Sequence, residues 1–153
     1  MKITARIILL LLAVSVLAGC APLAPQADIA ATTLPVYQFT QMLCQGTGLT
    51  VTRLVTESVS CLHDYSLNVR QVKTAEAAET VVISGAGLEE FMEDALHTSD
   101  ALVIDCSEGV HLLENESHHH DEHDHSHDGH DHGHFDPHYW MDAENAGIMV
   151  ENI

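Results

Sequence analysis

The sequence predicts an α/β protein, with a parallel sheet of about four strands and helices on both faces. Four short segments rich in β-branched residues alternate with segments whose apolar residues have helical spacing, a pattern typical of parallel sheets. Glycines and prolines stand between these segments, where turns are needed. The chain has 153 residues, of which 46% are hydrophobic, so we expect one folded domain rather than a disordered chain.

The first strand is predicted at 28–33, and Pro35 suits the first turn of the helix that follows. The apolar residues at helical spacing in this helix are Val36, Phe39, Met42 and Leu43. Gly46 and Gly48 then end it. The later elements are a strand at 49–55, a helix at 68–78, a strand at 80–84, a turn at 85–87, a helix at 88–96, a strand at 101–105 and a helix that begins near Met141.

The first 19 residues have the pattern of a signal peptide. Lys2 and Arg6 precede an apolar run at 7–18, which is shorter than the roughly 20 residues that a membrane-spanning helix needs. The run ends in Leu-Ala-Gly-Cys, which resembles the bacterial lipobox and makes Cys20 the expected lipid-modified first residue of the mature chain. The alternative is an ordinary cleavage site with an incidental cysteine. Residues 20–27 are then the lipidated cysteine and its tether, and export is predicted.

Acidic residues far outnumber basic ones in this chain. It has 23 Asp and Glu against 5 Lys and Arg, for a formal net charge of −18. After removal of the signal peptide only Arg53, Arg70 and Lys73 remain as basic residues besides histidine. So few cations cannot form an electropositive surface, which excludes nucleic acid as a partner.

Histidines are concentrated in one acidic segment, at about 114–136. Nine of the 13 lie there: His118, His119, His120, His123, His125, His127, His130, His132 and His134. No aliphatic residue lies between Leu113 and Phe135, so a disordered, solvated loop is expected. Imidazole mixed with carboxylate suits borderline divalent metals, zinc above all, and predicts an auxiliary low-affinity metal site. The alternatives are a purification tag, which the internal position argues against, and an acidic spacer without metal contact.

Two further histidines are predicted to lie at the carboxyl edge of the sheet, where ligands gather in such folds. His63 follows the second strand, and His138 precedes the last helix. Pro137 fixes the backbone that enters His138, and the Tyr139-Trp140 pair is expected to shield it from water. Each histidine is alternatively a hydrogen-bonded structural residue. The two remaining ones, His97 and His111, lack this context and are interpreted as surface or local structure.

Several motifs occur together in the order of one known family: the lipobox, His-x-Tyr at 63–65, Gly-Ala-Gly-Leu-Glu at 85–89, the His-rich loop and Asp-Pro-His-Tyr-Trp at 136–140. From Cys20 onward the chain resembles the zinc-uptake substrate-binding lipoproteins of bacterial ABC transporters, also called metal-binding adhesins. The resemblance implies one lobe of a periplasmic-binding-protein-like fold at 28–153, with His63 and His138 as metal ligands. It also implies Zn²⁺ as the transported ion (Mn²⁺ is less favoured), an ABC permease as partner and a monomer. The location implied is the outer face of the cytoplasmic membrane, through a lipid anchor, or the periplasm.

Three departures from the family pattern stand out. Leu62 replaces the usual proline before the first ligand, and Ala143 replaces the proline of the usual Asp-Pro after the tryptophan. Family members are also about twice as long, with a second lobe that supplies a third histidine and a carboxylate. Apolar residues at helical spacing run to Ile153 without a stop signal. We therefore expect the N-terminal lobe alone, in a truncated product or fragment; the alternative is a genuine one-lobe protein.

The expected activity is binding rather than catalysis, because a closed tetrahedral zinc site lacks the open coordination position that hydrolysis needs. One alternative is a hydrolase that uses zinc or a nucleophilic cysteine, Cys61 or Cys106, but no third orienting residue is apparent. Another is a stand-alone metal buffer or cell-surface adhesin. Once Cys20 is lipidated, three cysteines remain: Cys44, Cys61 and Cys106. The sequence leaves their disulfide pairing open.

Overall fold

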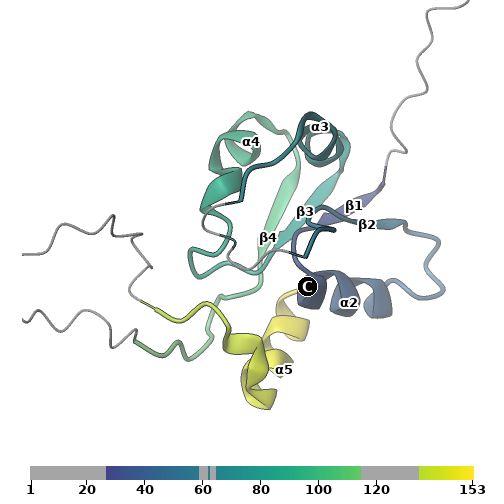
Figure 1. Cartoon of the computed structure of the whole chain (residues 1–153). Coiled ribbons are helices and arrows are strands. Elements are labelled where there is room, and N and C mark those ends of the chain that lie inside the picture. Colours follow the sequence, from purple (N-terminus) through teal and green to yellow (C-terminus); the bar gives the residue numbers. More distant parts are fainter. Residues whose placement is uncertain (1–26, 59–61, 63–64, 115–134) are drawn as a thin grey trace, which may run out of the picture.

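The computed structural model describes residues 27–58, 62, 65–114 and 135–153, which form a parallel sheet flanked by helices (Figure 1). The strands are β1 Ile29–Ala31, β2 Val51–Arg53, β3 Thr80–Ile83 and β4 Leu102–Asp105. They lie in the order β2-β1-β3-β4, so that Ile29 pairs with Val51 on one side and with Thr80 on the other. The predicted four-stranded parallel sheet is confirmed.

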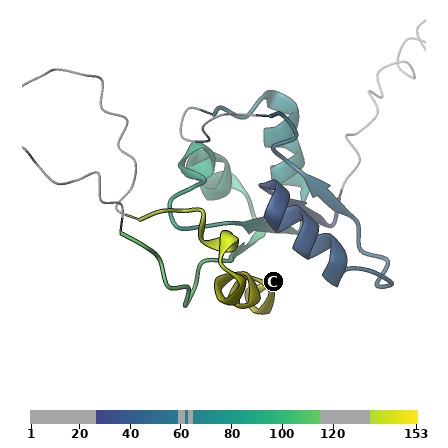
Figure 2. The same cartoon turned by 60° about the horizontal axis from the view of Figure 1, so that its bottom comes forward.

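Helices cover both faces of the sheet, as predicted. They are α2 Leu34–Leu43, α3 Val69–Ala77, α4 Glu93–Thr98 and α5 Ala143–Asn152, with 3-10 turns η1 Glu90–Met92 and η3 Tyr139–Met141. One face carries α3 and α4, and the opposite face carries α2 and α5 (Figures 1 and 2). Within the described ranges, no helix is long and apolar enough to cross a membrane.

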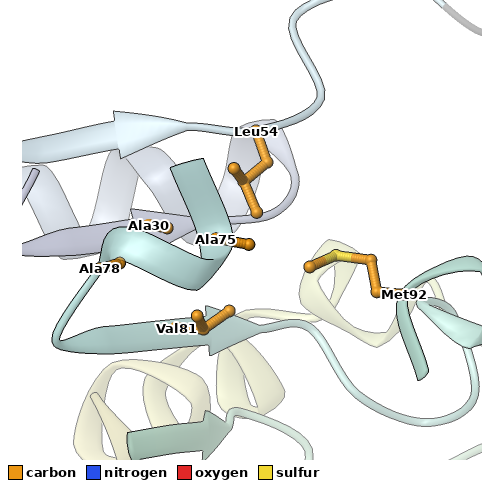
Figure 3. Close-up of a cluster of buried hydrophobic side chains, with 6 residues drawn as sticks. All are labelled: Ala30, Leu54, Ala75, Ala78, Val81 and Met92. Atoms are coloured by element: carbon orange, nitrogen blue, oxygen red, sulfur yellow. The ribbon is translucent and has the colours of Figure 1, made fainter. Parts of the chain in front are cut away.

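Each face of the sheet has its own hydrophobic core, because successive strand residues point to opposite sides. The first cluster lies under α3 and η1 and contains Ala30, Leu54, Ala75, Ala78, Val81 and Met92 (Figure 3). The second lies under α2 and α5 and contains Ala31, Val36, Val82, Cys106, Tyr139 and Met149. The neighbouring pairs Ala30-Ala31 and Val81-Val82 thus divide between the two cores, which explains why both central strands read as continuous small or β-branched runs.

The start of α3 follows its sequence closely. Asn68 is the N-cap, and its side-chain oxygen accepts from the backbone N–H groups of Arg70 and Gln71. The Gln71 side chain in turn accepts from the Asn68 backbone N–H at 2.8 Å, which completes a capping box. The predicted helix at 68–78 is confirmed with its ends trimmed by one residue.

The structure adds one detail to the predicted helices and corrects another. Met42 and Leu43 are 63% and 47% exposed, because α2 turns Val36 and Thr40 inward instead. Thr40 is tolerated there because its hydroxyl donates to the Val36 carbonyl at 2.8 Å. The helix predicted at 88–96 begins only at η1, since Glu89 has a non-helical backbone (φ −104°, ψ 32°) and turns its side chain into the core.

Several predicted features lie outside the described residues. They are the signal peptide at 1–19, the lipidated Cys20, Cys61, His63 and the loop histidines at 118–134.

Candidate metal centre

A buried carboxylate, Glu89, organises the carboxyl edge of the sheet. Its Oε1 accepts from the Thr32 hydroxyl at 2.6 Å and from the Ser84 backbone N–H at 2.8 Å, and its Oε2 accepts from the Gly85 N–H at 3.0 Å. Thr32 follows β1, whereas Ser84 and Gly85 follow β3. One side chain therefore ties the ends of the two central strands together.

Burial raises the pKa of Glu89, and its hydrogen bonds from Thr32, Ser84 and Gly85 oppose that shift only in part. Within the described part of the chain, no Lys, Arg or His forms an ion pair with it. The two backbone donors occur together because Gly85, Ala86 and Gly87 all have positive φ (78°, 54° and 80°), which makes the chain curl around the carboxylate. The sequence analysis identified residues 85–87 as a turn and 85–89 as a family motif, but it assigned no role to Glu89.

Tyr139 connects the His138 segment to this edge. It is buried, and its hydroxyl donates to the carbonyl of Ser84. Burial raises the pKa of Tyr139, so the hydroxyl stays protonated and acts as a donor. Tyr139 packs in the second core and also lines the pocket beside His138, so its role in shielding that histidine from water stays a prediction. Trp140 is only partly buried and lies beside both His138 and Tyr139, with ring centroids 5.4 and 5.9 Å away.

His138 is held in one orientation by its own loop. It is the residue before η3, and the Asp136 carboxylate accepts its backbone N–H at 2.9 Å and lies 2.7 Å from its ring Nδ1. Both hydrogen bonds from His138 lower the pKa of Asp136, so that carboxyl group is ionised and Nδ1 is the protonated nitrogen. In a neutral ring, donation from Nδ1 leaves the Nε2 lone pair for a metal ion, which is the arrangement found in histidines that ligate metals. The side chain is 58% exposed and thus accessible to an incoming ion.

His138 lines an open pocket of about 310 Å³ at the end of α5. The polar residues of this pocket are His111, Asp136, His138, Asp142 and Asn145. His111 is exposed, and its main chain is fixed by Asn145, whose side chain accepts from the His111 N–H at 3.3 Å and donates to its carbonyl at 3.2 Å. The sequence interpretation of His111 as surface or local structure agrees with these bonds but missed its place beside His138.

The two ends of the His-rich segment come together at this pocket. Glu114 and Phe135 form an antiparallel bridge, and the Asp136 N–H donates to the Leu113 carbonyl at 2.9 Å. The residues at 115–134 themselves lie outside the described ranges. The predicted loop is therefore anchored at Phe135, one residue before Asp136 and three before His138.

The segment that carries His63 is also fixed at both ends. Gln71, which is buried on α3, donates through Nε2 to the Leu54 carbonyl at 2.7 Å and to the Tyr65 hydroxyl at 2.6 Å. The Tyr65 hydroxyl donates in turn to Glu57 at 2.7 Å. Gln71 thus joins the exit of β2 to the residue two places after His63. Among the described residues, which exclude His63, no three His, Cys, Asp or Glu side chains are grouped to hold a metal ion.

The described cysteines do not form a reactive centre. Cys106 is fully buried, and burial together with the nearby Asp105 raises the pKa of its thiol to about 12. A thiol that stays protonated at neutral pH is a poor nucleophile. Cys44 is partly exposed, and these two cysteines are not bonded to each other. Burial and the raised pKa therefore argue against Cys106 as the nucleophile of a hydrolase. The other candidate nucleophile, Cys61, lies outside the described residues.

The four-stranded α/β sheet with its helices has the fold of one periplasmic-binding-protein-like lobe, and comparison with known proteins identifies the family. The model of the family described as zinc-uptake complex component A, periplasmic (ZnuA), matches residues 29–153, so the chain belongs to this family. The family is one of substrate-binding proteins rather than enzymes.

Individual relatives match this chain at low sequence identity. A putative metal-binding protein of Treponema pallidum is 26% identical over 119 residues, which is 76% of this chain and 37% of that protein. Zn(II)-bound AdcA from Streptococcus pneumoniae is 25% identical, with a TM-score of 0.62, over 83% of this chain and 24% of that one. A Mn-bound periplasmic metal-binding protein from Candidatus Liberibacter asiaticus is 20% identical, with a TM-score of 0.61, over 82% of this chain and 42% of that one. The chain thus spans less than half the length of each.

Proposed function

We propose that this chain is the metal-capturing part of a zinc importer, which takes up Zn²⁺ outside the cytoplasm and delivers it to an ABC permease. The observation that carries the proposal is the geometry of His138. Its Nδ1 is paired with Asp136, which reserves Nε2 for a metal ion, and the residue lines an open pocket. His63 is the proposed second ligand, because the segment that carries it leaves β2 at the carboxyl edge of the sheet.

Capture then depends on a few residues with distinct roles. Asp136 holds the His138 ring in the tautomer that binds metal, and Gln71 holds the ends of the segment that bears His63. Zinc favours four ligands, so two coordination positions remain for water or for donors beyond the described residues. Zinc binds neutral imidazole, so capture should weaken as the pH falls below about 6.5.

Zinc is the proposed cargo rather than manganese for two reasons. AdcA, 25% identical to this chain, was solved with Zn(II) bound, whereas the Mn-bound relative at 20% identity supports the fold alone. The nine loop histidines also favour a borderline metal over one that prefers carboxylates. We propose that they form an auxiliary low-affinity store whose ends lie beside His138.

The proposal includes a place in the cell. The lipobox-like sequence before Cys20 supports a lipid anchor on the outer face of the cytoplasmic membrane, with the protein acting as a monomer there or in the periplasm. A Cys20→Ser variant should move from the membrane fraction to the soluble fraction. The proposal fails on this point if the variant stays with the membrane.

Zinc affinity tests the site directly. In a chain whose nine loop histidines are changed to Asn, His138→Ala should weaken zinc binding at least tenfold in competition with a chromophoric chelator, roughly what the loss of even a supporting group costs. His97→Ala is the matched control, because His97 is an exposed histidine on α4, on the opposite face of the sheet. Equal affinities of the two variants would rule out His138 as a ligand.

A second candidate function is a stand-alone metal buffer or adhesin, which the nine clustered histidines favour. It differs from transport in one measurable respect. Disruption of the gene should lower zinc uptake by cells in zinc-poor medium if the chain serves a permease, and should leave the uptake rate unchanged if it only buffers metal.

A further inference from the structure

The hydroxyl of Tyr139 forms a long-range link between the His138 segment and the sheet. Tyr139 directly follows His138 in the chain, whereas its hydrogen-bond acceptor, the carbonyl of Ser84, lies 55 residues earlier at the end of β3. The bond is buried, and it satisfies a carbonyl group that has left the strand ladder. Loss of the Tyr139 hydroxyl would remove this hydrogen bond from the buried Ser84 carbonyl.

The acceptor is itself fixed from its other side. The Ser84 N–H donates to Glu89, and the Ser84 hydroxyl lies 2.9 Å from the hydroxyl of Thr33, which follows β1. Glu89 is held in turn by Thr32 and Gly85. Tyr139 is therefore bonded to a point that two strands hold rigidly, not to a mobile loop.

The restraint that Asp136 places on His138 moves together with the histidine. Asp136 fixes the ring and the backbone of His138, but it stands only two residues away on the same segment. It sets the orientation of the imidazole within the loop and cannot set the position of the loop relative to the sheet. The Asp136 N–H bond to Leu113 leads to the base of the His-rich segment rather than to a strand.

We infer that Tyr139 is a positioning residue for metal binding: its hydroxyl bond to Ser84 sets where the Nε2 of His138 lies relative to the carboxyl edge of the sheet. This inference rests on the proposed function, since it concerns His138 as a ligand. Zinc sites require their donors in a fixed geometry, so a displaced imidazole binds more weakly even though its chemistry is unchanged.

Tyr139→Phe tests the inference because it removes the hydroxyl and keeps the ring in the core. Tyr37→Phe is the matched control, since the Tyr37 ring packs against the same core but its hydroxyl accepts only from the exposed Gln41, at 2.7 Å. Both are made in the full chain with Asn in place of the nine loop histidines. The readout is the ¹⁵N signals of the His138 imidazole during a titration with Zn²⁺ alone.

We expect the zinc midpoint at His138 to rise about tenfold in Tyr139→Phe and to stay unchanged in Tyr37→Phe, as outer groups typically tune metal affinity by 10- to 100-fold. The Nδ1–H signal should be the same in both variants, because its partner Asp136 moves with the ring. An unchanged midpoint, with only a lower melting temperature, would overturn the inference and leave Tyr139 a core residue.

Glu89→Gln decides the matter if Tyr139→Phe does not fold. Glutamine keeps one oxygen acceptor but places an amide nitrogen near the donor N–H of Gly85, which loosens the Ser84 peptide from its far side. A smaller rise in the zinc midpoint is expected, and no rise would overturn the inference. If His138 in the parent chain does not respond to zinc at all, the proposed function fails, which is a different result from equal responses in parent and variants.

Discussion

Replacing Gly85 with alanine should be far more damaging than the same change two residues later at Gly87. Both glycines have the left-handed backbone that L-residues avoid, with φ of 78° and 80°. A Cβ on Gly85 would lie 1.8 Å from Oδ1 of Asp105 and 2.5 Å from Oγ of Ser107, whereas a Cβ on Gly87 would meet nothing nearer than Glu90 at 3.7 Å. The two variants therefore share the backbone strain and differ only in the collision.

The magnitude follows from what the collision displaces. Left-handed strain costs roughly 1 kcal/mol in either variant. To make room in Gly85→Ala, Asp105 must give up its hydrogen bonds from the Ser107 N–H at 2.8 Å and the Ser107 hydroxyl at 2.7 Å. At about 1 kcal/mol each, these losses bring the expected destabilisation of Gly85→Ala to about 3 kcal/mol, against about 1 kcal/mol for Gly87→Ala.

Urea unfolding followed by far-ultraviolet circular dichroism measures both values. A loss of about 3 kcal/mol is a large part of the stability of a small domain. The urea midpoint of Gly85→Ala should therefore lie well below that of Gly87→Ala. Equal midpoints for the two variants would refute the reasoning, because they would mean that Asp105 does not occupy the space beside Gly85.

Three further outcomes are expected. Because burial raises the pKa of Glu89, the folded chain binds a proton that the unfolded chain has released above about pH 4.5. The unfolding free energy of the parent should therefore rise relative to that of Glu89→Gln as the pH falls from 7 toward that value, and a constant difference between the two would contradict the raised pKa. In the native chain, a thiol reagent should modify Cys44 well before the buried Cys106, and equal rates would contradict the described core. Deleting Ser117–His134 should remove most of the zinc bound by the chain in calorimetry, since nine imidazoles outnumber two; retention of the full stoichiometry would show that the loop binds little.

The sheet was predictable because its strands carry their own pattern. The pairs Ala30-Ala31 and Val81-Val82 are apolar at successive positions, as is typical of strands that are buried on both faces. Asn68 and Gln71 have the spacing of a capping box at the start of α3. Helical spacing alone does not show which apolar residues are buried. Met42 has this spacing on the last turn of α2, but its side chain is exposed.

The candidate site was predictable only where its residues lie close together in one sequence motif. Asp136 and His138 stand two residues apart, so their pairing is local. The bond from Tyr139 to Ser84 crosses 55 residues and depends on the packing of the segment against β3, which no spacing rule contains. Glu89 was hidden for the same reason, since an acidic residue near a glycine turn is usually solvated, and only the folded backbone brings its three donors together.

The claim that His63 and His138 bind one ion is tested most directly by anomalous diffraction at the zinc absorption edge, on crystals of the chain grown with Zn²⁺. The account predicts a peak about 2.0–2.1 Å from Nε2 of His138 and at the same distance from a ring nitrogen of His63. A peak bonded to His138 with His63 turned away from it, or zinc confined to the loop histidines, would contradict the account.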